Sequence, residues 1–381
     1  MRPLLLALPA LVVAVPAQEV AMAAACVPGV TDARIDGATA SAIVALCYGS
    51  QAGATLLPSG VMLDLDAPAI ATVGLADAGG STFLSVPFPA NAYRGLPFVA
   101  QAVAWNAALS LDQPGALVVS APQPLRVPAI GDEAEVYVLF GQSNAEGQAE
   151  AALLPAALRG RLPRCRIWND GAAAFQALHE GVNTRTASPA SWCGPELALA
   201  RGLTAKGRTV WLVKLALGAT ALGPTPGPWN EWGVEAGELY AVLMFRVAAA
   251  CNALRQQGLA PRVRGICMMQ GESDATDADQ AAGYRPRLLQ LVDRMRADLL
   301  AAGDAGAEPV PFVLGLIHRE LPASFFPFVA RVRAAQAAVV AARPAVRAVE
   351  TSGLSLLDDG VHLSTAGVVQ LGELFAAALT N

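Results

Sequence analysis

The feature that most constrains the fold is a regular alternation of strand-like and helix-like segments in the last two thirds of the chain. Apolar runs of strand length alternate there with longer stretches of helical periodicity. Strands buried on both faces have such continuous apolar runs, and strands that alternate with helices form parallel sheets. The strand-like runs are "EVYVLF" at 135–140, "TVWLVKLAL" at 209–217, "RVRGICMMQ" at 262–270, "PVPFVLGLI" at 309–317 and "AVRAVE" at 345–350.

This alternation predicts an α/β fold over residues 131–381, built as a three-layer, doubly wound parallel sheet with helices on both faces. Ligand sites in such sheets lie at the carboxyl ends of the strands. Polar residues that directly follow a strand-like run are therefore the first candidates for function. The helical stretches that we expect are 195–205, 238–257, 279–302, 328–342 and 364–379.

The preceding region, residues 25–130, has a different pattern. Short β-like runs such as "VMLDL" and "STFLSVPFP" are separated by Gly, Pro, Asn and Asp, which predicts a small all-β, sandwich-like domain. The region contains no histidine and few charges, so it offers no catalytic constellation. It resembles the small β-domains that accompany catalytic domains in secreted bacterial proteins. A packing module and a carbohydrate- or surface-binding module are the two interpretations that remain.

The first residues, "MRPLLLALPALVVAVPA", combine one positive charge, a short apolar run and small residues. This pattern predicts a secretory signal peptide over residues 1–17, and hence a secreted or periplasmic bacterial protein. The apolar run is shorter than the roughly 20 residues that span a bilayer, so we expect no stable membrane insertion. Cleavage before Cys26 would instead give a lipoprotein, but "AAAC" lacks the usual larger apolar residue. A buried N-terminal element is the other alternative.

Export makes the six cysteines candidates for disulfides. Six cysteines allow about 15 pairings, so the sequence does not give the connectivity. The simplest pairings join neighbours, Cys26 with Cys47 and Cys165 with Cys193, which leaves the last two as ordinary buried thiols. No CxxC pattern occurs, so nothing indicates a zinc or redox site.

The composition excludes one class of partner. The chain has 26 Lys and Arg residues against 31 Asp and Glu residues, a formal charge of −5. A nucleic-acid-binding protein would need a basic face, so we expect no nucleic-acid partner. With 54% hydrophobic and 15% charged residues over 381 positions, the chain is long and apolar enough for a large buried core.

One serine follows the first strand-like run, in "VYVLFGQSNAEGQ". The hydroxyl of Ser143 becomes a nucleophile only when a base takes its proton. Of the three histidines, His362 lies in a loop before the last helix, and Asp359 precedes it by three residues. A carboxylate at that spacing can orient the imidazole and stabilise the imidazolium, although Asp359 could also serve as a turn or cap residue. We expect structural roles for His179 and His318.

Four motifs occur in the order of a known family: "GQSN", "KLALGATAL", "MMQGESD" and "DDGVH". With this order the chain resembles the SGNH hydrolases, and most closely the branch of sialate O-acetylesterases and family 6 carbohydrate acetyl esterases. The likeness covers about 135–379 and includes "GPELALARGL" and "YRPRLLQLVDRMRADL". The nucleophile turn differs from the GxSxG elbow of the α/β-hydrolases, because Ala145 replaces the second glycine.

The resemblance implies a role for each matching residue. Ser143 corresponds to the nucleophile, His362 to the base and Asp359 to the acid that orients it. The backbone N–H groups of Ser143 and Gly218 correspond to oxyanion donors. Gln270 stands where more distant relatives use asparagine, so its side-chain amide is the expected third donor. The family needs no metal ion and no organic cofactor.

Three residues at two sites depart from the family pattern, and two further features each allow two interpretations. Ala219 replaces a usual glycine, and Met268 and Met269 replace a common aromatic or histidine. The acidic run 272–279 could bind calcium, but its spacing misses the EF-hand pattern and a loop with a helix cap explains it as well. The indoles of Trp229 and Trp232 could stack on a sugar or anchor a loop.

The resemblance implies a secreted serine esterase that removes O-acetyl groups from carbohydrate through an acetyl-enzyme intermediate. An acetylated carbohydrate is then the expected partner. A general short-chain esterase or lipase is one alternative, and a catalytically silent carbohydrate-binding surface protein is the other. Specificity depends on loops between the motifs, so the sequence does not name the glycan, nor does it give protein partners or oligomeric state.

Overall fold

The computed structural model describes residues 19–380 apart from 58–59, 112, 114, 185–190, 205–206, 226–229 and 236–237. The predicted signal peptide therefore lies outside the described residues. The chain divides into two compact units. The first contains Ile35–Leu84 and Phe98–Pro124, and the second contains Ala23–Arg34, Ser85–Pro97 and the chain from Leu125 onward. This division differs from the predicted boundary at residue 130, because two earlier segments belong with the α/β part.

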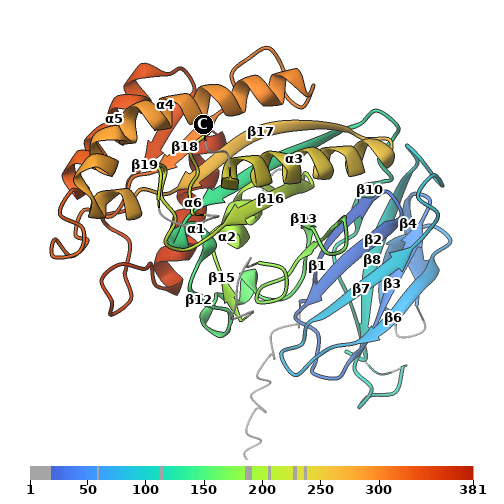
Figure 1. The fold of residues 1–381 in the computed structure, drawn as a ribbon. Helices are drawn as coiled ribbons and strands as arrows, with labels where there is room; N and C mark the ends of the chain where they lie inside the picture. The colour runs from blue at the N-terminus through green and yellow to red at the C-terminus, as the bar shows by residue number, and fades with distance from the viewer. Residues whose placement is uncertain are drawn as a thin grey trace, which may run out of the picture. The chain divides into compact units, whose positions relative to one another are not determined.

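The first unit is built from antiparallel strands (Figure 1). Its main sheet has the order β10-β8-β3-β6 with β9 paired to β8, and β4 pairs with β5 in a separate hairpin. Cys47, Leu63 and Leu65 form a small core. The strands are β3 (Ile43–Gly49), β4 (Ala52–Leu56), β5 (Met62–Leu65), β6 (Ala69–Leu75), β8 (Pro97–Trp105), β9 (Leu117–Val119) and β10 (Gln123–Arg126).

The two early segments of the second unit contain most of β1 and β2 and the end of β7, and these three strands form a sheet of order β1-β2-β7. Its strands are β1 (Ala21–Val27), β2 (Val30–Asp36) and β7 (Thr82–Pro87). Asp32 on β2 forms an ion pair with Arg166 at 2.6 Å, and both side chains are only 5% exposed. Since a buried charge without its partner is strongly destabilising, this pair ties the segment to the α/β part.

A seven-stranded sheet of order β14-β13-β16-β11-β17-β18-β19 forms the centre of the second unit. All neighbours are parallel except β13 and β14. The predicted α/β fold with a large parallel sheet is thus confirmed. The strands are β11 (Glu133–Gly141), β13 (Leu162–Asn169), β14 (Ala174–Leu178), β16 (Val210–Ala216), β17 (Ala260–Met269), β18 (Phe312–Gly315) and β19 (Val346–Val349).

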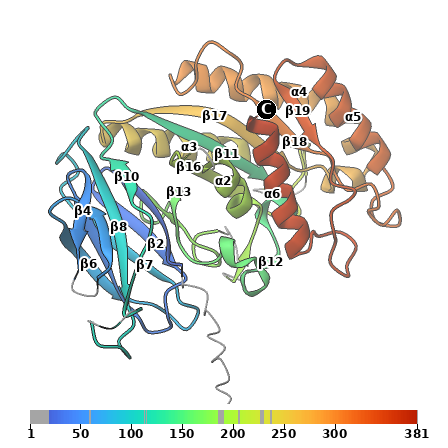
Figure 2. The same ribbon diagram turned by 180° about the vertical axis from the view of Figure 1, so that it is seen from behind.

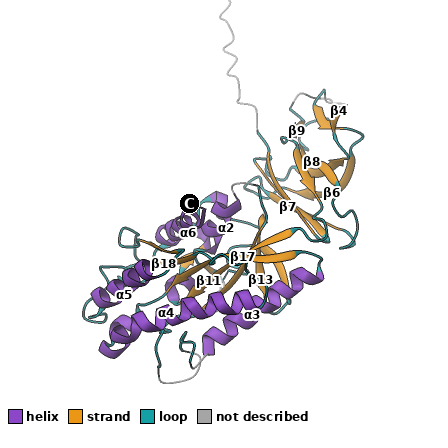
Figure 3. Cartoon of the chain, turned by 90° about the horizontal axis from the view of Figure 1, so that it is seen from above, coloured by secondary structure: helices purple, strands orange, loops and turns teal. Residues whose placement is uncertain are grey.

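Helices cover this sheet from two sides. Seen from behind, α2 (Glu196–Leu203) and α6 (Thr365–Thr380) lie in front of the strands (Figure 2). Figure 3 shows α3 (Glu238–Gln256), α4 (Ala278–Ala301) and α5 (Val329–Ala342) on the opposite side. The short elements are α1 (Ser143–Glu146), β12 (Ala149–Glu150), η1 (Ala151–Leu153), η2 (Ala156–Leu158), β15 (Trp192–Cys193) and η4 (Ser273–Thr276). In the described part of the chain, no helix is both long and apolar enough to cross a membrane.

The expected disulfides are wrong. All six cysteines lie in described segments, and each is a free, buried thiol. The suggested partners sit on different strands and have other neighbours: Thr31 donates a hydrogen bond to the sulfur of Cys26, and the Cys193 thiol donates to the carbonyl of Ala149. Burial raises the pKa of Cys165 and of Cys193 to about 12, so neither thiol is reactive at neutral pH.

Candidate active site

The nucleophile candidate lies where β11 ends at the carboxyl edge of the sheet. Gly141 has a φ of +140°, and a Cβ there would lie 2.0 Å from the carbonyl oxygen of Met269, so this turn requires glycine. Ser143 begins the short helix α1 directly after the turn and is 8% exposed. The apolar strand therefore delivers the serine hydroxyl to the strand end, as the sequence predicts.

The base loop, residues 357–363, holds the predicted acid and base together. Asp359 Oδ2 lies 2.6 Å from His362 Nδ1, while Asp359 Oδ1 accepts the N–H groups of Val361 at 2.8 Å and His362 at 2.9 Å. Partial burial opposes ionisation, but these donors outweigh it and hold the pKa of Asp359 below its usual value. The carboxylate is therefore ionised where it contacts the imidazole. The neighbouring Asp358 is exposed.

The side chain of Asn144 joins the nucleophile turn to the base loop. Its Oδ1 accepts the N–H of Leu363 at 2.9 Å, and its Nδ2 donates to the carbonyl of Val361 at 3.2 Å. These two contacts flank His362 on either side. Nδ2 also donates to Glu272 Oε1 at 2.7 Å. Sequence reasoning missed this clamp, although Asn144 is the last residue of the "GQSN" motif.

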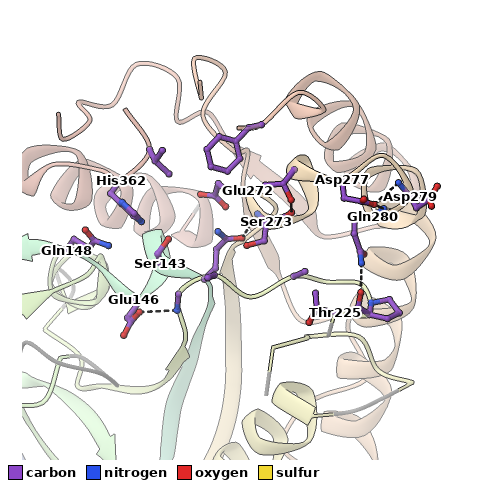
Figure 4. Close-up of a pocket in the computed structure, with 18 residues that line it drawn as sticks. Ser143, Glu146, Gln148, Thr225, Glu272, Ser273, Asp277, Asp279, Gln280 and His362 are labelled. Carbon is purple, nitrogen blue, oxygen red and sulfur yellow. Dashed lines mark hydrogen bonds between the residues drawn. The ribbon is translucent and has the colours of Figure 1, made fainter. Parts of the chain in front are cut away.

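A pocket of about 920 Å³ opens in front of these residues, and Ser143, Gly218 and His362 all line it. Figure 4 shows the ring of His362 and the hydroxyl of Ser143 facing each other at one end of the pocket. Asp359 lies behind His362 and contacts the far ring nitrogen. The structure thus brings together the three triad candidates and the glycine, although they come from separate parts of the sequence.

Gln270 is not among the residues that line this pocket. Its side chain is 1% exposed, its Nε2 donates to Asp274 Oδ2 at 2.5 Å, and its Oε1 accepts the hydroxyl of Tyr284 at 3.0 Å. The amide that the family resemblance assigned to the oxyanion is therefore engaged in the core. The geometry does not support Gln270 as the third donor, because the carboxylate four residues later holds its N–H group.

Gln142 offers an amide that sequence reasoning did not consider. It lines the pocket directly before Ser143. Its Oε1 accepts the backbone N–H groups of Gly271 at 3.2 Å and Ser273 at 3.3 Å, which fixes the orientation of the amide. Its Nε2 donates to no described residue, so the N–H₂ group is free to face a substrate. Its place beside the serine in "GQSN" was the available signal.

Gly218 lies beside the nucleophile, since a Cβ on it would be 3.6 Å from the Cβ of Ser143. Its N–H donates to Glu146 Oε2 at 3.1 Å (Figure 4). A carboxylate thus occupies the predicted oxyanion donor and has to move aside before a substrate oxygen can take its place. The next residue, Ala219, also lines the pocket and has a left-handed φ of +60°.

The acidic run 272–279 follows β17 and has structural contacts of its own. Asp277 accepts the N–H groups of Asp279 and Gln280 at 2.9 Å each, which confirms the predicted helix cap at the start of α4. Asp274 accepts the N–H groups of Leu222 and Gly223, and burial raises its pKa to about 6. Within the described residues, no group of three or more potential ligands could hold a metal ion.

The remaining candidates have packing roles. Trp232 is fully buried, lies 5.1 Å from the ring of Phe140, and donates its indole N–H to Thr220, which confirms the loop-anchor interpretation. Trp229 lies outside the described residues. His318 is 3% exposed and accepts the N–H of Glu320. Met268 and Met269 are both 1% exposed in β17 and do not line the pocket.

The sequence of the α/β part matches a known family. Residues 133–381 match the model of a family described as carbohydrate esterase, sialic acid-specific acetylesterase. The chain belongs to this family. It is a carbohydrate acetylesterase, a carboxylic ester hydrolase whose substrate is an acetylated carbohydrate. The resemblance predicted from the four motifs is confirmed.

This acetylesterase is also similar to individual known proteins. A probable carbohydrate esterase of Arabidopsis thaliana is 26% identical over 269 residues, which are 65% of this chain and 91% of that protein. A solved Arabidopsis thaliana structure has a TM-score of 0.51 at 24% identity and covers 66% of this chain and 99% of its own. The crystal structure of NanS also has a TM-score of 0.51, at 18% identity, and covers 66% of this chain and 97% of its own. Both solved structures have the same fold as the α/β part of this chain.

Proposed function

We propose that the acetylesterase cleaves O-acetyl groups from carbohydrate with Ser143, His362 and Asp359 as its triad. The observation that carries the proposal is the 2.6 Å contact between Asp359 and His362 at the pocket that Ser143 lines. The Asp359 carboxylate fixes the tautomer in which Nδ1 carries the proton. Nε2 is then the basic nitrogen on the side of the ring that faces the serine.

The reaction proceeds in two halves. His362 takes the proton of Ser143 as the hydroxyl oxygen attacks the acetyl carbonyl carbon, and the resulting imidazolium protonates the departing sugar oxygen. The acetyl-enzyme remains. His362 then takes a proton from water, whose oxygen attacks the acetyl carbon, and returns the proton to Ser143 as acetate leaves.

Three N–H groups are proposed to stabilise the oxyanion: the backbone N–H of Ser143, the backbone N–H of Gly218 and the side-chain amide of Gln142. The first two follow the family pattern. Gln142 takes the place first given to Gln270, because it lines the pocket and its Nε2 is uncommitted. The Glu146 carboxylate has to leave the Gly218 N–H as substrate enters, since an oxyanion and a carboxylate would repel each other.

We further propose the finer architecture and location that the sequence predicts. The scaffold is a three-layer, doubly wound SGNH-type sheet preceded by a small all-β domain, and the chain is exported after cleavage of residues 1–17. The apolar, singly charged N-terminus supports export. Mass spectrometry of the protein recovered outside the cytoplasm of an expressing bacterium should place the mature N-terminus at Gln18.

The test of the function uses acetate release from a panel of acetylated glycans, with simple aryl acetates beside them. We expect a fluorophosphonate probe to label the wild type at Ser143, and Ser143→Ala to be unlabelled and inactive while remaining folded. A folded Ser143→Ala variant that keeps a tenth of the wild-type rate would rule out this nucleophile. Rapid cleavage of aryl acetates with no release from any glycan would favour a general short-chain esterase instead.

A further inference from the structure

The pocket beyond Ser143 and His362 is lined by carboxylates. Four acidic side chains reach it: Glu146, Glu272, Asp277 and Asp279. Figure 4 places Glu146 and Glu272 near the triad end and the two aspartates at the far end, beside Gln280 and Thr225. No lysine or arginine is among the described residues that line it, and His362 is the only group there that can become a cation.

Two basic side chains close to this pocket donate hydrogen bonds to other residues of the chain. Lys214 is 4% exposed, and its ammonium group donates to the Glu196 carboxylate at 2.7 Å and to the carbonyls of Glu146 and Thr184. Arg287 donates to the side-chain oxygen of Gln280 at 3.1 Å and does not line the pocket. The Lys214 ammonium group is therefore not available to pair with an anionic substrate, and the described lining of the pocket includes no lysine or arginine.

An unpartnered buried atom shows what the pocket lacks. Glu272 is 1% exposed and lines the pocket, yet its Oε2 has no hydrogen-bond partner among the described residues, while its Oε1 is held by Asn144. Burial raises the pKa of Glu272, so its carboxyl group can be protonated or ionised, and a hydroxyl, which both donates and accepts, matches Oε2 in either state. A sugar supplies such a hydroxyl, and the negative charge of the pocket then rests on Glu146, Asp277 and Asp279. The carboxylate of a sialic acid would bring a like charge beside these three groups.

We propose that this pocket accepts the acetylated ring of a non-anionic sugar and disfavours sialic acids and other anionic sugars. The inference rests on the proposed function and names the substrate class for the same site. The proposed substrate therefore differs from sialic acid, the sugar that the description of the family names. Like charges in a partly enclosed pocket repel each other far more than they do in open water, since the effective dielectric constant is lower there.

The first test compares two substrates that differ only in charge: an O-acetylated sialic acid and its carboxamide, in which the carboxylate is replaced by a neutral amide. An O-acetylated neutral methyl glycoside is the third substrate. At low ionic strength we expect kcat/KM for acetate release to be at least about 10-fold higher for the carboxamide than for the acid, and the gap to narrow with added salt. The neutral glycoside should be cleaved at least as well as the carboxamide.

Three outcomes would overturn the inference, and they are distinguishable. Equal or faster cleavage of the free acid would show that the pocket tolerates the anion. Cleavage of the neutral glycoside but of neither sialic acid derivative would show that shape, and not charge, excludes them. No acetate from any of the three carbohydrates, with aryl acetates still cleaved, would remove the proposed function itself.

A charge reversal tests whether the pocket carboxylates cause the selection. Asp279 has an exposed side chain at the far end of the pocket. Its backbone N–H donates a hydrogen bond to Asp277, and a change of side chain keeps this N–H. Asp279→Lys should raise the acid-to-carboxamide ratio of kcat/KM by about 10-fold, equivalent to about 1.4 kcal/mol. Glu308→Lys makes the same change in net charge at an exposed site outside the pocket and should leave the ratio unchanged. If Asp279→Lys leaves this ratio unchanged, the pocket carboxylates are not the cause of the preference for uncharged sugars.

Discussion

Two regions flank Ser143 and use their carboxylates in opposite ways. In the base loop, 357–363, the Asp359 side chain is 44% exposed and contacts the imidazole of His362, itself 23% exposed. In the exit of β17, residues 270–274, Asp274 and Gln270 are at most 1% exposed and contact each other. One region holds a proton acceptor at the pocket, whereas Gln270 and Asp274 in the other lie outside its lining.

The difference shows what a polar residue needs in order to take part in chemistry at a strand end. A reacting group must keep one face toward the substrate, so the base loop uses backbone N–H groups to position Asp359 and leaves the far side of the imidazole uncommitted. At the β17 exit, the Gln270 amide donates to Asp274, to the carbonyl of Thr220 and to Oε1 of Gln142, and it accepts from Tyr284, so none of its hydrogen-bonding atoms is left for a substrate. A buried polar group with satisfied partners stabilises the fold and does not react.

The largest expected effect lies in the base loop. Asp359→Asn replaces the acceptor of the Nδ1 proton with an amide, which favours the wrong tautomer and weakens the imidazolium. We expect turnover to fall by about 10³- to 10⁴-fold with little change in thermal stability. Steady-state kinetics and a melting curve measure the two quantities.

Asp358→Asn is the matched control, because it removes one exposed carboxylate from the same loop. Its turnover should stay within about 3-fold of the wild type, the range of a surface substitution within about 0.5 kcal/mol. If Asp358→Asn were the more damaging of the two variants, the assignment of the triad acid would have to be reversed.

The next effect separates the two glutamines. Gln142→Ala removes the side-chain donor at the pocket, and we expect kcat to fall by about 10²- to 10³-fold, or about 2.7 to 4 kcal/mol, with KM little changed. Gln142→Glu keeps an oxygen for the N–H groups of Gly271 and Ser273 but puts negative charge where the oxyanion forms. It should be at least as inactive while keeping the stability of the wild type. Restored activity in Gln142→Glu would mean that Gln142 only ties loops together.

Gln270 gives the opposite result if the β17 exit is scaffold. Gln270→Ala removes one donor from the buried carboxylate of Asp274, which keeps the N–H groups of Leu222 and Gly223. It also removes one acceptor of the Tyr284 hydroxyl, which keeps the backbone carbonyl of residue 270. We expect the free energy of unfolding to fall by about 1 to 3 kcal/mol, with kcat of the folded variant nearly unchanged. Denaturant unfolding and active-site titration with the fluorophosphonate probe separate the two quantities. A loss of kcat like that of Gln142→Ala, at normal stability, would return the oxyanion role to Gln270.

How far the sequence could predict the site depends on how local each contact is. Burial on both faces leaves continuous apolar runs, so the parallel sheet and the position of Ser143 after its first strand could be predicted. Asp359 and His362 are three residues apart, and their pairing follows from that spacing. The clamp of Asn144 on Leu363 joins residues 219 positions apart, and nothing in either segment indicates it.

The burial of the Gln270 amide, which the sequence did not lead us to expect, has a physical cause of the same kind. The sequence shows that an amide follows β17, but it does not show which of several acceptors the amide finds. Asp274 lies four residues away and is drawn inward by the N–H groups of Leu222 and Gly223, which come from another strand end. The cysteine pairings fail for a similar reason, because closeness in sequence says little about which strands are adjacent.

The smallest expected effect is that of a substitution at Ala219, which follows β16 and lies outside both regions. Ala219 has a left-handed φ of +60°, which disfavours a side chain by about 1 kcal/mol or more. Ala219→Gly removes that strain, but it also gives the unfolded chain more freedom, which lowers stability by about 0.4 to 1 kcal/mol. The two contributions nearly cancel, so we expect the free energy of unfolding to change by less than about 0.5 kcal/mol. The N–H of Gly218 is untouched, so kcat on a small acetate ester should stay the same. A change in kcat of more than about 10-fold, or about 1.4 kcal/mol, would show that the Ala219 methyl group positions the oxyanion donors, and β16 would then join the base loop as a reacting region.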